Sequence, residues 1–391
     1  MHDPDPVPHW AEHGPFPPAA RRAPPEPKNA HATSGILLFG IVATLTTYVV
    51  AWIGYVVFED RFPGSLISIW KRWDALHYLA IARDGYGTET TGGILSIWPP
   101  LYSWCIRLLE PLAGGDHEAA LALSGLFFLG TLLAFYRLVA LDFPDRVAAR
   151  SVLYLAIFPT AYFFHAAYSE SLFTFLAVGS FLAARHDRWG LAGLAGGLAA
   201  MTRITWVALL PALLVEYAIQ KQFRWRAVGW DLAYLLLMPL GFSVFLLINL
   251  HVYGDPLHFL EVQRNVMGKK IAPPWVGLQM IWAHVRAEGA SRFITVGVFE
   301  TVAVIGALVI TLASALRLRF SYAVYMFLGW CNIAFTNWWL GSLRYWLPLF
   351  PAFLVLSLWG ERRVVNALLC MLSLMTYTLL TVLFVRGWWT Y

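Results

Sequence analysis

One acid in this sequence stands among aromatic residues directly after the first long apolar run. Residues 72–87 read RWDALHYLAIARDGYG, where Asp74 follows Trp73 and precedes His77 and Tyr78. An amphipathic helix on a membrane surface would explain the aromatic residues. It would not explain a carboxylate at the headgroup level, where a basic side chain costs less free energy. We therefore predict that Asp74 is catalytic, as a general base that removes the proton of an acceptor hydroxyl.

The neighbours of this acid, Arg72, Trp73, His77 and Tyr78, are candidate substrate-binding residues. A helix over residues 66–83 would place Trp73 and His77 on one face, with the acid beside them. His77 could orient a substrate, although a structural hydrogen bond would explain this histidine equally well.

A second group of polar residues, FFHAAYSESLF at 163–173, falls between two apolar segments. Ser169 could cap the helix that follows, and Glu170 would then lie near the positive end of the helix dipole. Alternatively, an acid and a hydroxyl at a membrane turn would bind sugar hydroxyls as hydrogen-bond acceptor and donor. On this second interpretation, His165, Tyr168 and Glu170 bind substrate.

Two arginines interrupt apolar segments. Arg203 lies near the middle of the apolar residues 190–218, where a cation is costly unless it reaches water or an anion. Two short helices meeting at Arg203 would relieve that cost and bring a helix N-terminus close to it, an arrangement that suits phosphate. Arg344, followed by Tyr345, begins a later apolar segment, where it could also be a snorkelling arginine. We predict that these three residues bind substrate.

The remaining motifs argue against cofactor chemistry. The sequence contains no Walker pattern and no dinucleotide fingerprint. The acids Asp3 and Asp5 fall in the N-terminal tail, away from the other candidates. We therefore expect no cofactor and no essential metal ion, with arginine meeting the charge of a phosphate group. The long polar segment 253–292 could form a lid over a membrane cavity or merely a solvated loop.

Composition places these residues in a membrane protein. Of the 391 residues, 59% are hydrophobic and 13% are charged, whereas about a quarter of the residues in soluble domains are charged. The net charge of +5 is scattered over short loops, as in proteins oriented in a membrane by their charges. We therefore expect no binding to nucleic acid.

The apolar segments predict an all-α polytopic membrane protein. Residues 96–112 are short and interrupted by prolines, so we expect them to lie along the membrane interface. Residues 190–218 are expected to form two short helices that turn at 202–203. The single candidate spans are 36–58, 118–138, 147–164, 169–185, 229–252, 293–316, 320–337, 344–360 and 364–386.

Basic loops decide how these segments cross the membrane, because short loops rich in lysine and arginine favour the cytoplasm. About eleven spans, with the N-terminus inside and the C-terminus outside, place all the basic loops inside. Residues 1–33 are then a disordered cytoplasmic tail, and residues 34–391 form one transmembrane domain. Its external loops, 59–117 with juxtamembrane helices and 253–292, share the outer face with the turn at 165–168, the elbow at 202–203 and residues 338–344. The basic loops lie at 137–150, 185–188, 221–226, 317–319 and 362–363.

In motif order, RWDALHYLAIARDGYG, WPPLY, AYSESLF, LAAMTRITWVALLP and RYWLPLFP resemble the PIG-V-type mannosyltransferases. That family includes GPI mannosyltransferase 2 and bacterial relatives and belongs to the GT-C superfamily of membrane glycosyltransferases. The resemblance implies the GT-C fold, an outer-face active site and a polyprenyl-phosphate-linked sugar donor. It also implies that Asp74 is the catalytic acid of the first external loop and that Glu170 is the second acidic position.

The residues and the resemblance together predict a membrane glycosyltransferase, in the first place a mannosyltransferase, that transfers a hexose with inversion. Its partners would be a polyprenyl- or dolichyl-phosphate-linked donor, a lipid or glycan acceptor, and membrane lipids. We expect a multi-pass protein of the bacterial plasma membrane, or of the endoplasmic reticulum in a eukaryote. The alternative is a lipid or sugar transporter or flippase, which can also use intramembrane arginines and broken helices. A transporter of that kind should show an internal repeat, and we find none in the sequence.

Overall fold

The structure is a computed structural model that describes residues 30–59, 62, 64–87, 93–289 and 292–388. These residues form α-helices joined by short helical turns, and their only recorded β-pairing is an isolated bridge between Ile271 and Thr336. The prediction of an all-α protein is confirmed. The predicted tail, 1–33, lies outside the described residues except for its last four, which begin the first helix.

Long apolar helices support a protein integral to the membrane. Within the described residues, five helices have the length and composition to cross a bilayer. They lie in α2 (Ala30–Glu59), α5 (Asp116–Ala140), η7 (Trp230–Leu236) continued by α10 (Leu237–Tyr253), η8 (Phe293–Val298) continued by α13 (Phe299–Arg317), and α16 (Arg363–Val385).

Shorter helices occupy the other predicted spans, so each of these spans contains a helix. They are α6 (Asp145–Ala156) with η4 (Ala161–Phe164), α7 (Glu170–Arg185), α8 (Trp189–Ala200), η5 (Ile204–Ala208) with α9 (Leu209–Gln220), α14 (Phe320–Ala334) and α15 (Pro351–Trp359). The number of eleven crossings stays a prediction. The predicted span 344–360 is too long, because its helix begins only at Pro351 after the turn η9 (Arg344–Trp346).

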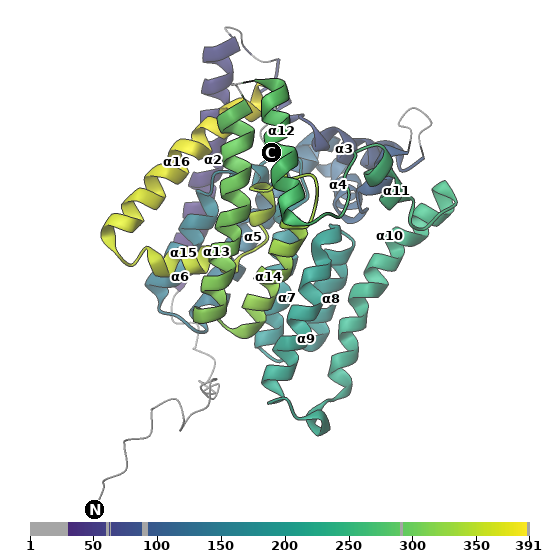
Figure 1. Cartoon of the computed structure of the whole chain (residues 1–391), viewed down its shortest axis with the longest axis vertical. Helices are drawn as coiled ribbons and strands as arrows, with labels where there is room; N and C mark the ends of the chain where they lie inside the picture. Colours follow the sequence, from purple (N-terminus) through teal and green to yellow (C-terminus); the bar gives the residue numbers. More distant parts are fainter. Residues whose placement is uncertain (1–29, 60–61, 63, 88–92, 290–291, 389–391) are drawn as a thin grey trace, which may run out of the picture.

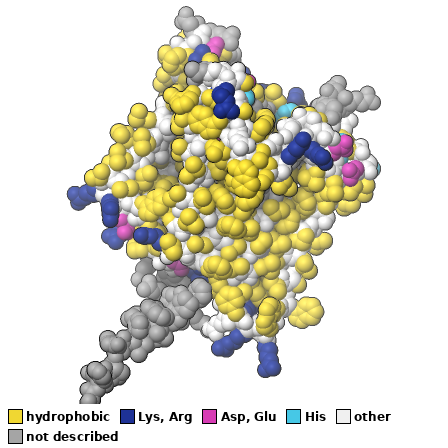
Figure 2. All heavy atoms as spheres, in the orientation of Figure 1, with side chains coloured by type: hydrophobic (Ala, Val, Ile, Leu, Met, Phe, Trp, Pro, Cys, Tyr) yellow, Lys and Arg dark blue, Asp and Glu magenta, His cyan; other side chains and the backbone are white. Residues whose placement is uncertain are grey.

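The five basic loops meet at one end of the bundle, the basic end. Arg185 donates two hydrogen bonds to Asp142, at 2.6 and 2.7 Å, and Arg319 donates two to the buried Glu216, at 2.6 and 2.9 Å. Arg150 donates to the carbonyl of Gly360. Figure 2 shows hydrophobic side chains over the flanks of the bundle, with Lys and Arg side chains at its lower edge and also at its left, right and upper parts. The charge pattern therefore predicted correctly which loops share one side.

Short helices cover the opposite end, which we call the loop end (Figure 1). Residues 64–115 contribute η1 (Ser68–Trp70), α3 (Asp74–Asp84), η3 (Ile94–Ile97) and α4 (Leu101–Ala113), and the segment after α10 contributes α11 (His258–Asn265) and α12 (Pro274–Glu288). The expected single helix over 66–83 is wrong. It breaks before α3, where Trp73 takes φ = 51°, a backbone conformation that side chains with a Cβ rarely adopt.

Glycines bring α8 and α10 into close contact. A Cβ on Gly241 would lie 2.2 Å from the carbonyl oxygen of Gly197, and one on Gly193 would lie 2.1 Å from the carbonyl oxygen of Tyr234. Only glycine fits at such an approach, as in other tightly packed membrane helices. The run GLAGLAGG at residues 190–197 therefore allows these helices to pack closely.

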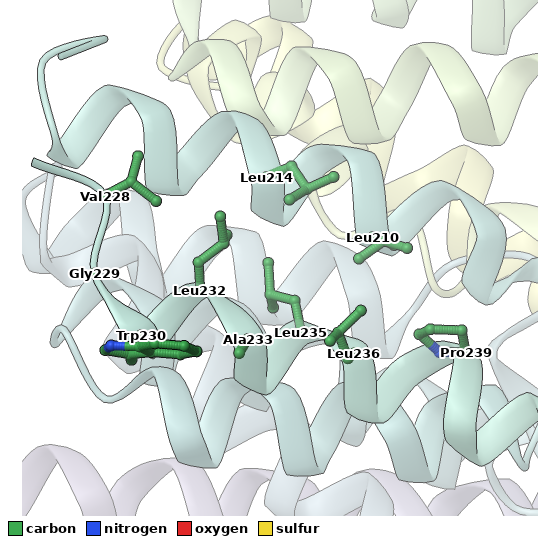
Figure 3. A pocket seen from close by; sticks show the side chains of 10 residues that line it. All are labelled: Leu210, Leu214, Val228, Gly229, Trp230, Leu232, Ala233, Leu235, Leu236 and Pro239. Carbon is green, nitrogen blue, oxygen red and sulfur yellow. The ribbon is translucent and has the colours of Figure 1, made fainter. Parts of the chain in front are cut away.

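A cavity of about 550 Å³ forms an apolar groove between α9 and the η7–α10 helix. Figure 3 shows Leu210 and Leu214 of α9 facing Leu232, Leu235 and Leu236 across it. No titratable side chain lines this groove. It therefore offers no group for acid–base chemistry, and the candidate site lies elsewhere.

Candidate active site

Asp74 is the first residue of α3, and its side chain is 27% exposed. Its Oδ2 accepts a hydrogen bond of 2.7 Å from Nη1 of Arg344, a residue 270 positions later in the chain. The turn that presents this acid is held on both sides. Arg72 donates through Nε and Nη2 to the carbonyl of Val385 at the end of α16, and its own carbonyl accepts from the hydroxyl of Tyr168 at 3.0 Å. An accessible carboxylate on a fixed turn suits a general base.

Glu170 is the first residue of α7 and is almost fully buried. Its Oε1 accepts from Nη1 of Arg203 at 2.7 Å and also from Nε of Arg344. Its other oxygen, Oε2, is buried and has no hydrogen-bond partner among the described residues. A buried carboxylate is costly unless it is paired, and here two guanidinium groups pair with it.

Ser169 does not cap α7, contrary to one of the two interpretations of this segment, because it makes no side-chain capping bond. Its Oγ lies 2.7 Å from the hydroxyl of Tyr78 and accepts from Nη1 of Arg203 at 3.1 Å. The hydroxyl therefore joins α3 to the α8–α9 elbow. The segment 163–173 is also more enclosed than an external turn would be, since His165, Tyr168 and Ser169 are all buried.

Arg203 occupies the predicted break between two short helices. The chain is extended at this residue, with φ = −152° and ψ = 143°, after α8 ends at Ala200 and before η5 begins. The carbonyl of Met201 in the same elbow accepts from the backbone N–H of Leu101 at 3.0 Å, which ties the elbow to α4. The elbow itself is confirmed, and it aims the guanidinium at the acidic residue of α7.

Arg344 is the centre of the cluster, because its guanidinium binds both Asp74 and Glu170. Its carbon Cζ lies 4.7 Å from the ring centroid of Phe163 and 4.6 Å from that of Tyr168. A planar guanidinium can stack on aromatic rings and bond to two carboxylates at the same time, whereas an ammonium group cannot.

Lys269 is a further cation at this site, which the sequence reasoning did not single out. Its ammonium lies 5.3 Å from the centroid of the Tyr345 ring, and Cζ of Arg203 lies 5.8 Å from the same centroid. Its loop is held by Asn337, whose Oδ1 accepts from the N–H of Lys270 at 2.6 Å. Part of the segment 253–292 therefore lies beside the cluster, and the lid over a membrane cavity stays a prediction.

The charges of the cluster do not cancel. Two carboxylates, Asp74 and Glu170, face three cations, Arg203, Arg344 and Lys269, which leaves one positive charge in excess. Within the described residues, no carboxylate forms an ion pair with Lys269. A bound anion such as a phosphate would balance this excess at a partly buried site, where electrostatic attraction is stronger than in water.

Two predicted site residues lie beside the cluster rather than in it. His77 stacks on Trp98 with 4.2 Å between the ring centroids. Burial lowers the pKa of His77, with the nearby Asp74 carboxylate acting in the opposite direction, so this imidazole is neutral at pH 7. His165 points elsewhere, since its ring packs on Phe128 at a centroid distance of 4.7 Å. Tertiary packing thus separates His165 from Glu170, although the two are close in sequence.

Comparisons of the sequence with known proteins identify mannosyltransferases. Residues 98–249 match the family model of dolichyl-phosphate-mannose-protein mannosyltransferases. The GPI alpha-1,6-mannosyltransferase 2 of Rattus norvegicus is 30% identical over 151 residues, which are 37% of this chain and 31% of that protein. The protein of the same name from Mus musculus is 30% identical over 162 residues, which are 40% of this chain and 33% of that protein. These matches confirm the resemblance drawn from the motifs, and they cover about a third of each relative's length.

The fold has a counterpart among solved structures. The crystal structure of ArnT from Cupriavidus metallidurans bound to undecaprenyl phosphate superposes with a TM-score of 0.53 and 14% sequence identity. The superposition covers 86% of this chain and 63% of ArnT. This likeness confirms the predicted GT-C fold.

Proposed function

We propose that this protein is a membrane mannosyltransferase that transfers a hexose from a polyprenyl-phosphate carrier to a hydroxyl of a lipid or glycan. The observation that carries the proposal is the cluster at the loop end, where Arg344 joins Asp74 to Glu170 beside two further cations. The mannosyltransferase relatives support the sugar and the reaction class. They also favour a transferase over the alternative of a transporter or flippase. The polyprenyl phosphate bound by ArnT supports the class of donor.

The proposed reaction is a single displacement. The carboxylate of Asp74 removes the proton of the acceptor hydroxyl, whose oxygen attacks the anomeric carbon. The bond from that carbon to the phosphate oxygen breaks on the opposite face, so the configuration inverts and polyprenyl phosphate leaves. The charge that develops on the phosphate is stabilised by three cations, Arg203, Arg344 and Lys269. No covalent sugar–enzyme intermediate is formed.

The other predicted residues that lie in the cluster would bind sugar or acceptor hydroxyls, whereas His165 would not. Glu170 accepts hydrogen bonds, and Tyr78, Tyr168 and Tyr345 carry hydroxyl groups close to the cluster. Trp73 is 39% exposed beside Asp74, where it would contact the sugar. The active site would face the outside of a plasma membrane, or the lumen in a eukaryote, because the five basic loops lie at the opposite end.

The direct test is donor consumption by the purified protein in nanodiscs. Polyprenyl-phosphate-mannose is supplied with an extract of membrane lipids as acceptor, and the release of polyprenyl phosphate is measured. Polyprenyl-phosphate-glucose serves as the matched donor. We expect mannose transfer that requires the acceptor extract. If neither donor is consumed, and labelled donor instead crosses the bilayer intact, the transporter alternative replaces this proposal.

A further inference from the structure

Glu300, in the first turn of α13, is a buried acid outside the cluster. Its side chain is only 1% exposed, and no cation forms an ion pair with it among the described residues. Instead, its two oxygens accept backbone hydrogen bonds from one turn. Oε1 accepts from the N–H of Gly341 at 2.6 Å, and Oε2 accepts from the N–H of Ser342 at 2.9 Å. An acid in an apolar helix is costly and points to a function.

The turn that Glu300 holds is the one from which Arg344 extends. The carbonyl of Gly341 accepts from the N–H of Arg344 at 3.1 Å, and the carbonyl of Ser342 accepts from the N–H of Tyr345 at 3.2 Å. The same two residues therefore bond to Glu300 through their N–H groups and to the active-site residues through their carbonyls. Gly341 has φ = 88°, a conformation that favours glycine, so the path of this turn depends on a specific backbone geometry.

A second contact with α13 lies on the other side of Arg344. The indole Nε1–H of Trp346 donates to the carbonyl of Ala303 at 3.2 Å, and its ring stacks on Phe158 with 5.5 Å between centroids. Ala303 is three residues after Glu300, so both contacts come from one face of the helix. Thr160 makes a third contact with this segment, because its Oγ1 donates a hydrogen bond to the carbonyl of Leu343 at 3.2 Å.

We propose that Glu300 is a positioning residue, which fixes the turn at Gly341 and Ser342 so that the guanidinium of Arg344 reaches Asp74 and Glu170. Glu300 itself touches neither the acids nor the substrate. This inference rests on the proposed function, because Arg344 matters for turnover only if the cluster performs the transfer.

The first experiment measures the turn without any substrate. Glu300→Gln keeps the shape of the side chain but turns an amide NH2 toward one of the two backbone N–H donors. We expect the backbone amides of residues 338–346 to exchange hydrogen faster than in the wild-type protein. The exchange is measured by mass spectrometry. The matched control is Thr301→Val, which removes a hydroxyl with no hydrogen-bond partner one position along the same helix turn. Unchanged exchange in Glu300→Gln would overturn the proposal.

The second experiment asks whether Glu300 acts through Arg344. A buried backbone N–H that loses its acceptor corresponds to about a tenfold to hundredfold fall in kcat/KM, and we expect that fall in Glu300→Gln but not in Thr301→Val. In an Arg344→Lys background the same substitution should lower kcat/KM by less than about threefold, since the effects of coupled residues are not additive. Equal losses in both backgrounds, together with a lowered Tm, would reduce Glu300 to a purely structural residue.

Two precautions keep these outcomes separate. If Glu300→Gln does not fold, Trp346→Phe removes the indole N–H, together with part of the ring that stacks on Phe158, and is put through the same cycle. We expect a smaller fall in kcat/KM than in Glu300→Gln, and again a fall that is not additive with that of Arg344→Lys. Additive falls would contradict the proposal. If the wild-type protein transfers no sugar, the proposed function fails, but the exchange experiment still decides whether Glu300 holds the turn.

Discussion

At the scale of single residues, the cluster combines groups that would each be costly alone. Glu170 is buried, and its charge is met by Arg203 and Arg344. Arg344 also binds Asp74, the more accessible of the two acids. The pairing therefore distinguishes the roles of the two carboxylates. Glu170 organises the arginines from within the bundle, and Asp74 lies where an acceptor can reach it.

The role of Asp74 predicts a large loss in Asp74→Asn. The amide keeps the shape of the side chain but is not a base, so transfer should fall by about 10² to 10⁴, the usual contribution of a general base. Donor binding should persist, and we would measure it by the quenching of a fluorescent donor analogue. Asp84→Asn, at the other end of α3, is the matched control. Wild-type turnover in Asp74→Asn would remove this residue from the mechanism.

Arg203→Lys should weaken the use of the donor. The guanidinium of Arg203 bonds to Ser169 and Glu170 and lies over the ring of Tyr345, whereas an ammonium group offers no planar fork for the same set of contacts. We expect a higher KM for the donor, with a smaller change for the acceptor, in steady-state kinetics that vary each substrate in turn. A change in the KM for the acceptor alone would show that Arg203 binds the acceptor and not the donor.

Transfer should survive chelation of divalent cations. Arginine and lysine meet the charge of the phosphate in the proposed reaction, and the acids of the cluster are already paired with arginine. We would compare initial rates in EDTA and in Mg²⁺ or Mn²⁺ and expect them to agree. Loss of activity in EDTA that added metal restores would show that Asp74 and Glu170 bind an ion during the reaction.

At the scale of elements, the polar side chains of the cluster are positioned by breaks between helices more than by the helices themselves. The chain departs from regular helix before Asp74, at Arg203 and before Arg344, and each departure turns a polar side chain toward the same point. The freed backbone groups are bonded to other elements, as the pairing of Met201 with Leu101 illustrates. Irregular backbone of this kind is tolerated near a membrane only where protein or water covers it.

The contact between α8 and α10 predicts that Gly241→Ala destabilises the protein. Its Cβ would lie 2.2 Å from the carbonyl oxygen of Gly197, so the two helices must separate. Overpacking of this kind typically costs about 1–3 kcal/mol, and thermal unfolding in detergent should show a lower Tm. Gly125→Ala in α5 is the control, because its Cβ would meet nothing within 4 Å. Equal Tm values for the two variants would contradict the close packing.

At the scale of the whole molecule, the five basic loops lie at one end of the bundle and the cluster lies at the other. The basic end carries five loops rich in arginine and lysine, tied together by pairs such as Arg185–Asp142 and Arg319–Glu216. The loop end carries the acids and arginines of the cluster. Short basic loops favour the cytoplasm, so this arrangement predicts both the orientation of the protein and the side on which the reaction occurs.

Cysteine labelling tests that orientation. In a background without the three native cysteines, Asp255→Cys at the loop end should react with a membrane-impermeant thiol reagent added outside intact cells. Gln222→Cys at the basic end should react only after the membrane is opened, and both positions are exposed. The reverse pattern would place the cluster in the cytoplasm and remove the argument for an outer-face reaction.

The sequence by itself determined the class of protein, the helical segments and the main residues of the cluster. Apolar runs must become helices in a bilayer because their backbone groups have no other partners, so composition alone predicts an all-α membrane protein. Ionisable residues are costly within such runs and conspicuous at their ends, which is why Arg203 stood out within a run and Asp74, Glu170 and Arg344 stood out beside one.

Only the tertiary structure decided how these residues pair. Arg344 and Asp74 are 270 positions apart, and no local pattern predicts that one guanidinium binds both acids. Ser169 looked like a helix cap and instead bonds across the site, while Lys269 and Glu300 were hidden in a polar loop and an apolar helix. Local propensity depends on neighbours in sequence, whereas the positions of these charges depend on contacts between distant helices.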